Sequence, residues 1–128
     1  MRGPKAFINL DHLKSNFDMI QKYLNGKRIM AVVKANGYGH GSVPCSLALE
    51  SHGCNFFGVF SIEEGIELRN AGIKSDILVF SALDPTSLNE AVKNNLILNI
   101  SDISHLNALI NFHKKTNNAP RIHIKVDT

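Results

Sequence analysis

Residues 29–41 read IMAVVKANGYGHG and carry the strongest structural signal of the chain. The apolar run 29–33 predicts a buried β-strand, because continuous β-branched runs are typical of strands covered on both faces. The run stops at Lys34, and three glycines then alternate with Tyr38 and His40. Active sites of parallel α/β folds lie at the carboxyl ends of the strands, so Lys34 is expected at that edge of a sheet.

The same kind of apolar run recurs along the chain and alternates with helical patterns. The expected strands cover residues 29–33, 56–60, 76–80, 96–100 and 122–126. The expected helices cover residues 10–25, 42–53 and 61–72 and begin again near residues 84 and 101. Strict alternation of strands and helices predicts a parallel sheet covered by helices.

Two architectures satisfy this alternation. One is an open, doubly wound sheet, which five strands complete. The other is a (β/α)8 TIM-type barrel, which needs eight strands and typically about 250 residues. The sequence ends at Val126-Asp127-Thr128, where a strand meets its loop and before any covering helix. We therefore expect the truncated, N-terminal part of a barrel, with about five parallel strands and their covering helices.

Composition excludes several classes of function. The chain has 128 residues, a net charge of +3, 44% hydrophobic and 20% charged residues. It lacks the basic clusters that nucleic-acid binding requires and the run of about 18 apolar residues that a membrane helix requires. Cys45 and Cys54 form neither a disulfide framework nor a zinc motif, so both are expected to be small buried hydrophobes. With no secretory apolar core near the N-terminus, a cytoplasmic protein is expected.

Lys34 has a chemical and a structural interpretation. An amine held among apolar groups is favoured in its neutral form, which attacks aldehydes to form a Schiff base. The glycines allow close approach of a ligand and the Tyr38 hydroxyl can reach a phosphate, which together suit pyridoxal phosphate. The alternative is a solvated lysine at a strand end, followed by an ordinary turn. A nucleotide-binding loop is disfavoured, since the lysine precedes the glycines and their spacing is wrong.

The segment AVVKANGYGHG closely resembles the pyridoxal-phosphate lysine signature of bacterial alanine racemases, and the resemblance extends along almost the whole chain. Four further segments match that family: INLDHLKSNF, FFGVFSIEEGIELRNAGI, ILVFS and HIKVDT. The first of these resembles the opening strand and first helix of the family, with the strand at Phe7–Leu10. In the family that strand packs with a second domain, so here it is expected to be unpaired. The last matches a segment that normally continues into Gly-Met-Gly-Arg.

The resemblance implies roles for three residues. Lys34 matches the lysine that holds pyridoxal 5'-phosphate as a Schiff base and acts as one of two opposed proton-transfer bases. Tyr38 matches a tyrosine that contacts the cofactor phosphate. Lys125 matches a lysine that is often carbamylated, as N6-carboxylysine, and then holds a nearby arginine. Alternation along the strand places His123, Lys125 and Asp127 on one face, and an unmodified Lys125 in an ion pair remains the alternative.

Other polar residues receive no chemical role. His40 is interpreted as a supporting or packing residue, and the remaining histidines show no metal-ligand spacing, so no metal is expected. Ser61 and Glu64 fit a capping box at a helix start. Glu63, Glu64 and Glu67 are expected on the exposed face of that helix, and none is proposed as an acid or base.

The activity implied by the resemblance is interconversion of L-alanine and D-alanine by two-base proton transfer, which supplies D-alanine for peptidoglycan. The resemblance implies that the intact enzyme is a homodimer. Its second base would be a tyrosine on a C-terminal β-domain, and that domain is absent from this sequence. Residues 1–128 are thus expected to be an incomplete pyridoxal-phosphate-binding barrel domain, inactive alone. The alternatives are a racemase of the same family for serine or another amino acid, or an inactive cofactor-binding fragment.

Overall fold

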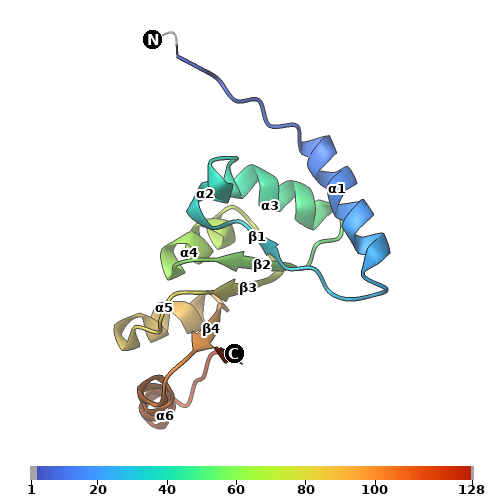
Figure 1. Ribbon diagram of the computed structural model, residues 1–128. Coiled ribbons are helices and arrows are strands. Elements are labelled where there is room, and N and C mark those ends of the chain that lie inside the picture. The colour runs from blue at the N-terminus through green and yellow to red at the C-terminus, as the bar shows by residue number, and fades with distance from the viewer. Residues whose placement is uncertain (1–2, 128) are drawn as a thin grey trace.

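The structure is a computed structural model that describes residues 3–127, and it contains one five-stranded parallel sheet (Figure 1). The strands are β1 (Ala31–Val32), β2 (Phe56–Val59), β3 (Asp76–Val79), β4 (Ile97–Ile100) and β5 (Ile122–Ile124). The other elements are α1 (Leu10–Tyr23), α2 (Lys34–Tyr38), α3 (Ser42–Ser51), α4 (Ile62–Asn70), η1 (Pro85–Ser87), α5 (Leu88–Lys93) and α6 (Ile103–Thr116). All five expected strands are confirmed, although each is shorter than its apolar run.

The order of the strands distinguishes the two architectures. The strands lie side by side in sequence order, β1-β2-β3-β4-β5, and every neighbouring pair is parallel. A doubly wound sheet instead reverses its strand order at a switch point. Sequential order without reversal is the arrangement of a barrel wall. The prediction of the N-terminal part of a (β/α)8 barrel is therefore confirmed.

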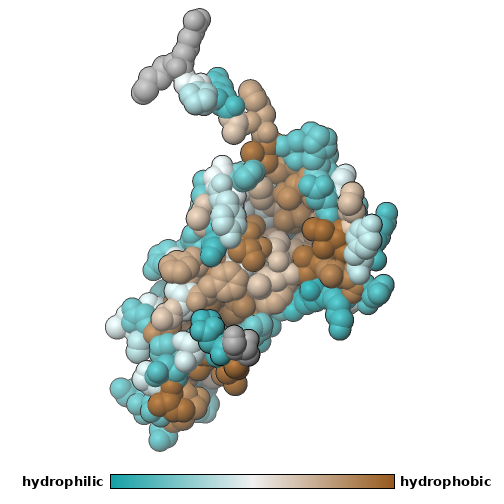
Figure 2. Space-filling model, in the orientation of Figure 1, coloured by the Kyte–Doolittle hydropathy of each residue, from teal (hydrophilic) through white to brown (hydrophobic). Residues whose placement is uncertain are grey.

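The two faces of the sheet differ in burial. Phe57 and Val59 of β2 and Ile77 and Val79 of β3 are almost inaccessible to solvent and pack beneath the helices. Their neighbours along the strands point to the other face, here called the open face, where Leu78 is buried but Val32 and Phe60 are 37% and 55% exposed. Figure 2 shows this apolar area over β1 to β3, rimmed by hydrophilic residues.

The last strand carries apolar side chains without a cover within residues 3–127. The register of β5 against β4 places Ile122 and Ile124 on the same face as the buried Leu98 and Ile100. Ile124 is nevertheless 75% exposed. In a (β/α)8 barrel each strand is followed by a helix that covers this face. The exposed apolar side chains of β5 therefore agree with the structure of a partial barrel.

Two expectations outside the sheet had different outcomes. Cys45 and Cys54 are free and buried, as predicted, and burial raises the pKa of both thiols. The segment Phe7–Leu10 is unpaired, as expected without its partner domain, and residues 3–9 have no regular structure. Its expected end at Leu10 is wrong, because Leu10 already begins α1. The reason is local: the Asn9 side-chain oxygen accepts hydrogen bonds from two amides of the first turn and caps the helix.

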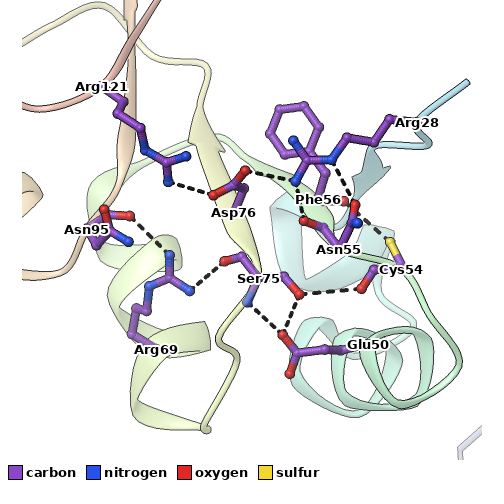
Figure 3. A network of polar contacts seen from close by, with 10 residues as sticks. All are labelled: Arg28, Glu50, Cys54, Asn55, Phe56, Arg69, Ser75, Asp76, Asn95 and Arg121. Carbon is purple, nitrogen blue, oxygen red and sulfur yellow. Dashed lines mark hydrogen bonds and ion pairs between the residues drawn. The ribbon is translucent and has the colours of Figure 1, made fainter.

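A polar network joins the amino ends of the strands, at the edge of the sheet opposite to Lys34 (Figure 3). The Arg69 guanidinium donates hydrogen bonds to four backbone carbonyls, those of Ile73, Ser75, Asn94 and Asn95. Beside it, the Asp76 carboxylate binds Arg28 at 2.8 Å and also Arg121. These contacts tie the loops before β3 and β4 together, so the network supports stability rather than chemistry.

Replacing Asp76 by asparagine is expected to weaken the fall in thermal stability as the pH is lowered. The hydrogen bond from Arg121 is the main cause that holds the pKa of Asp76 below its usual range; burial opposes it, and the hydrogen bond from Arg28 adds to the lowering. A lowered pKa in the folded state stabilises the fold above the unfolded-state pKa, and this contribution disappears as the pH falls below about 4. Thermal midpoints measured from pH 6 to 3 should therefore fall more steeply for the native chain than for Asp76→Asn.

The matched control is Asp11→Asn, because the Asp11 side chain on α1 is 89% exposed. In this variant the thermal midpoint should fall between pH 6 and 3 as steeply as in the native chain. An equally steep fall in Asp76→Asn would show that the ion pairs with the two arginines do not contribute to stability.

Candidate functional site

Lys34 directly follows the buried Val33 at the carboxyl end of β1. Its side chain is half-buried and points toward the open face, where Nζ lies 5.9 Å from the centroid of the Phe80 ring. Phe80 itself follows β3, so the lysine crosses above the end of β2 to reach it. The structure thus places Lys34 at the strand end where sequence reasoning expected it.

The turn after Lys34 is left-handed. Ala35, Asn36, Gly37 and Tyr38 have φ values of 51°, 52°, 61° and 54°. A left-handed conformation costs an L-residue other than glycine roughly 1–2 kcal/mol. The three members of this turn other than Gly37 bear that cost, so surrounding contacts must hold the backbone. Segment α2 is therefore a strained turn and not an ordinary α-helix.

Hydrogen bonds fix the turn to the strand before it and the helix after it. The Gly37 amide donates to the Val33 carbonyl at 2.8 Å, and the Gly41 amide donates to the Asn36 carbonyl at 2.9 Å. The Asn36 side-chain oxygen accepts from the Ser42 amide at 3.0 Å, which supports the start of α3. Gly41 has a φ of 93°, and a Cβ there would lie 2.8 Å from Pro44 Cγ, so only glycine fits.

Glu64 contacts the turn from a different part of the chain. Its Oε1 accepts a hydrogen bond from the Ala35 amide at 2.8 Å, and its Oε2 accepts from the Phe60 amide at 2.6 Å. The expectation that Glu64 belongs to the exposed face of α4 is wrong: it is half-buried, because its carboxylate satisfies two strand-end amides. Ser61 does cap α4 through its hydroxyl, as predicted, but the Glu64 side chain serves the site instead of closing a capping box.

The other residues of the signature lie on the same turn. Tyr38 is four positions after Lys34, and its side chain is 62% exposed. A ring nitrogen of His40 lies 3.0 Å from the Gly37 carbonyl oxygen. This contact is local to the turn and agrees with a supporting role for His40. The turn therefore presents one amine and one phenol at the same edge of the sheet.

Lys125 lies at the other margin of the sheet. Its amide donates to the Ile100 carbonyl at 2.8 Å and so continues the pairing of β5 with β4. His123 packs edge-on against the Phe56 ring, which places His123, and by alternation Lys125, on the open face. Lys34 and Lys125 therefore follow the two edge strands of the sheet, β1 and β5.

A glycine in β2 makes room for the ring beneath Lys34. Gly58 lies in register between Val32 of β1 and Leu78 of β3. A Cβ built on Gly58 would lie 2.5 Å from Cζ of Phe80, well inside van der Waals contact. The Phe80 ring therefore rests against the backbone of β2, where it forms the floor of the Lys34 site.

Gly58→Ala is expected to destabilise the native chain by about 1–3 kcal/mol, because the added methyl group overpacks the Phe80 ring. In a Phe80→Ala background the same substitution should cost little, since the obstructing ring is gone. A double-mutant cycle measured by urea unfolding should give a coupling energy of about 0.5–3 kcal/mol. Additive effects of the two substitutions would mean that Phe80 does not cover Gly58.

Comparisons with known proteins agree on one family. The model of the family described as alanine racemase, N-terminal domain, matches residues 8–128. Alanine racemase 1 of Caldanaerobacter subterraneus subsp. tengcongensis is 38% identical over 129 residues, covering 100% of this chain and 33% of that protein. The chain thus spans about a third of the length of the curated relatives it matches.

Solved structures give the same result. An alanine racemase of Clostridium difficile 630 superposes with a TM-score of 0.88 at 30% identity, covering 94% of this chain and 32% of that one. A histidine racemase of Leuconostoc mesenteroides superposes with a TM-score of 0.81 at 26% identity, covering 88% of this chain and 30% of that one. Within residues 3–127, no helix has the length and apolar character needed to cross a membrane.

Proposed function

The chain belongs to the alanine racemase family, and from this premise we propose that it is the pyridoxal-phosphate-binding barrel domain of an alanine racemase. The observation that carries the proposal is the position of Lys34. Its amine lies at the carboxyl end of β1, on the open face of the sheet and above the Phe80 ring. Ligands of barrel enzymes bind at this edge.

The residues at this edge fit pyridoxal phosphate in their chemistry. The cofactor needs an amine that can join its aldehyde carbon and a donor for its phosphate. Lys34 offers the amine, and Tyr38 offers an exposed hydroxyl on the same turn. Gly37 and Gly39 have no side chains, so a ligand can approach the backbone of the turn closely there.

The proposal assigns two tasks to Lys34 and one to Tyr38. Lys34 holds the cofactor through Nζ, and the same nitrogen moves the α-proton on one face of the substrate. The Tyr38 hydroxyl binds the phosphate. When bound, pyridoxal phosphate makes the α-hydrogen of an attached amino acid acidic by delocalising the charge left behind.

The remaining parts of the proposal concern the whole enzyme. Proton transfer on two faces requires a second base, which we expect from a tyrosine on a C-terminal β-domain of the other subunit in a homodimer. We expect the enzyme to act in the cytoplasm and to supply D-alanine for peptidoglycan. Lys125, on the open face of β5, is proposed to be carbamylated in that enzyme, with an unmodified ion-paired lysine as the alternative.

A different amino acid is the second candidate substrate. The histidine racemase among the similar structures supports this alternative, because its fold over this region resembles that of the chain. Serine and basic amino acids belong to the same group of candidates. An inactive cofactor-binding fragment is the non-enzyme alternative.

Deuterium exchange tests the function directly. A racemase that carries this chain as its N-terminal domain should exchange the α-hydrogen of alanine with solvent deuterium and form the opposite enantiomer. Serine, histidine and lysine are assayed in parallel to identify the preferred substrate. Absence of exchange with every amino acid, in a preparation that binds pyridoxal phosphate, would contradict the racemase function.

A further inference from the structure

We propose that Glu64 is a positioning residue that holds Lys34 at its strand end by tying together the ends of β1 and β2. The effect on cofactor capture rests on the proposed function of Lys34, whereas the tie itself does not. Glu64 lies on α4, the helix that follows β2, and its carboxylate reaches back over the sheet edge. The tie therefore joins segments that are 29 residues apart in the sequence.

The geometry of the carboxylate supports a tie and not a surface charge. Each oxygen accepts one backbone amide, that of Ala35 at 2.8 Å and that of Phe60 at 2.6 Å. Hydrogen bonds to a charged acceptor are shorter and roughly twice as strong as neutral ones. Because the two amides belong to the ends of adjacent strands, one rigid planar group sets their separation.

The helix that carries Glu64 is itself held in place. Ser61 caps its first turn, and Gly65 lies so close to Leu96 that a Cβ there would be 3.0 Å from two Leu96 methyl carbons. This contact sets how deeply α4 sits against the sheet. Because α4 is fixed in this way, the Glu64 carboxylate stays in place and can hold the turn that contains Ala35.

The bonded amide belongs to the residue directly after Lys34. Ala35 is also the first left-handed residue of the turn, with φ 51° and ψ 49°. A strained backbone persists only where its contacts over-determine it. Without the Glu64 acceptor the turn can relax toward ordinary backbone conformations, and the Lys34 amine then leaves its place above Phe80.

The test compares Glu64→Ala and Glu64→Gln with Glu67→Gln, a matched control on the exposed side of the same helix. The first measurement is amide hydrogen exchange in the chain without cofactor. Loss of a charged acceptor should speed exchange at Ala35 and Phe60 by about 10- to 100-fold in Glu64→Ala. Glutamine keeps one acceptor oxygen, so its effect should be intermediate, and the control should match the native chain.

Amides of the sheet core report on global folding. The Val33 amide donates to the Gly58 carbonyl at 2.9 Å and should remain protected in all variants. If Glu64→Ala loses this protection as well, the comparison is made on Glu64→Gln. Unchanged exchange at both Ala35 and Phe60 in a folded Glu64 variant would overturn the tie.

The second measurement is the rate at which pyridoxal phosphate becomes covalently attached to Lys34, trapped by borohydride. We expect a slower rate in both Glu64 variants, by about the same factor as the exchange effect, and the native rate in Glu67→Gln. A native rate in Glu64→Ala, despite fast exchange at Ala35, would overturn the positioning role. If the native chain attaches no cofactor at Lys34, the proposed function fails, while the exchange result still decides whether Glu64 ties the two strands.

Discussion

Replacing Lys34 by alanine is expected to abolish racemisation in any racemase that carries this chain as its N-terminal domain. In the proposed function, the substitution removes both the amine that holds the cofactor and the base on one face of the substrate. General acid–base groups alone typically contribute about 10²–10⁴-fold, and the loss of the covalent attachment adds to this. We expect the rate of D-alanine formation from L-alanine, measured by a chiral assay, to fall at least about 10⁴-fold.

The control for this experiment is Lys93→Ala, because Lys93 is an exposed lysine in the last turn of α5. This variant should racemise alanine at the native rate. Racemisation by Lys34→Ala within about 10-fold of the native rate would show that another group holds the cofactor, since the acid–base contribution alone exceeds this factor.

Residues 1–128 alone are expected to show no measurable racemisation, even with added pyridoxal phosphate. Racemisation needs proton transfer on both faces of the bound substrate, and in the proposed function Lys34 is the base on one face only. Loss of the opposed base should cost at least about 10²–10⁴-fold, and loss of the remaining binding groups need not add to this simply. Any residual chemistry should be exchange of the α-hydrogen from a single enantiomer.

The assay follows D-alanine formed from L-alanine by the purified chain, with Lys34→Ala as its control. Turnover at an ordinary enzymatic rate that disappears in Lys34→Ala would show that residues 1–128 contain a second base. The interpretation of this edge of the sheet as half of a two-base site would then be wrong.

Much of the fold was predictable, because the strands and helices of the barrel wall each have a short, local pattern of apolar residues. The apolar runs 56–60 and 76–80 predict strands, and helical spacing between runs predicts their crossovers. Alternation alone leaves the barrel and the doubly wound sheet open, and the sequential strand order of the structure distinguishes them. The position of Lys34 was predictable for the same reason, since the residue after a buried parallel strand must lie at the edge of the sheet.

The parts that sequence reasoning missed depend on contacts between distant residues. Glu64 has the pattern of a capping residue, and nothing in its neighbourhood reveals that the Ala35 amide lies 2.8 Å from its side chain. The left-handed conformation of Asn36 and Tyr38 was hidden as well, because both residues also suit ordinary turns. The one indication in the sequence was that Glu64 is the third residue of the helix after β2, from where a carboxylate can reach back to the end of the strand.

The N-terminal segment shows a local preference that the resemblance did not include. The family pattern places a strand at Phe7–Leu10 that packs with a second domain, so an unpaired segment was expected here, and Phe7 is 90% exposed. The resemblance did not show that Asn9 caps α1 and that the helix already begins at Leu10. A capping side chain needs only its own neighbours, whereas a strand needs a partner strand.

The central claim is that Lys34 is the residue that holds pyridoxal phosphate, and one measurement tests it most directly. The protein is incubated with the cofactor, reduced with borohydride, digested, and mapped by peptide mass. We predict that the reduced cofactor is found on the peptide containing Lys34 and disappears from the map of Lys34→Ala. A label on another lysine, such as Lys125 on the open face of β5, with none on Lys34, would contradict the account.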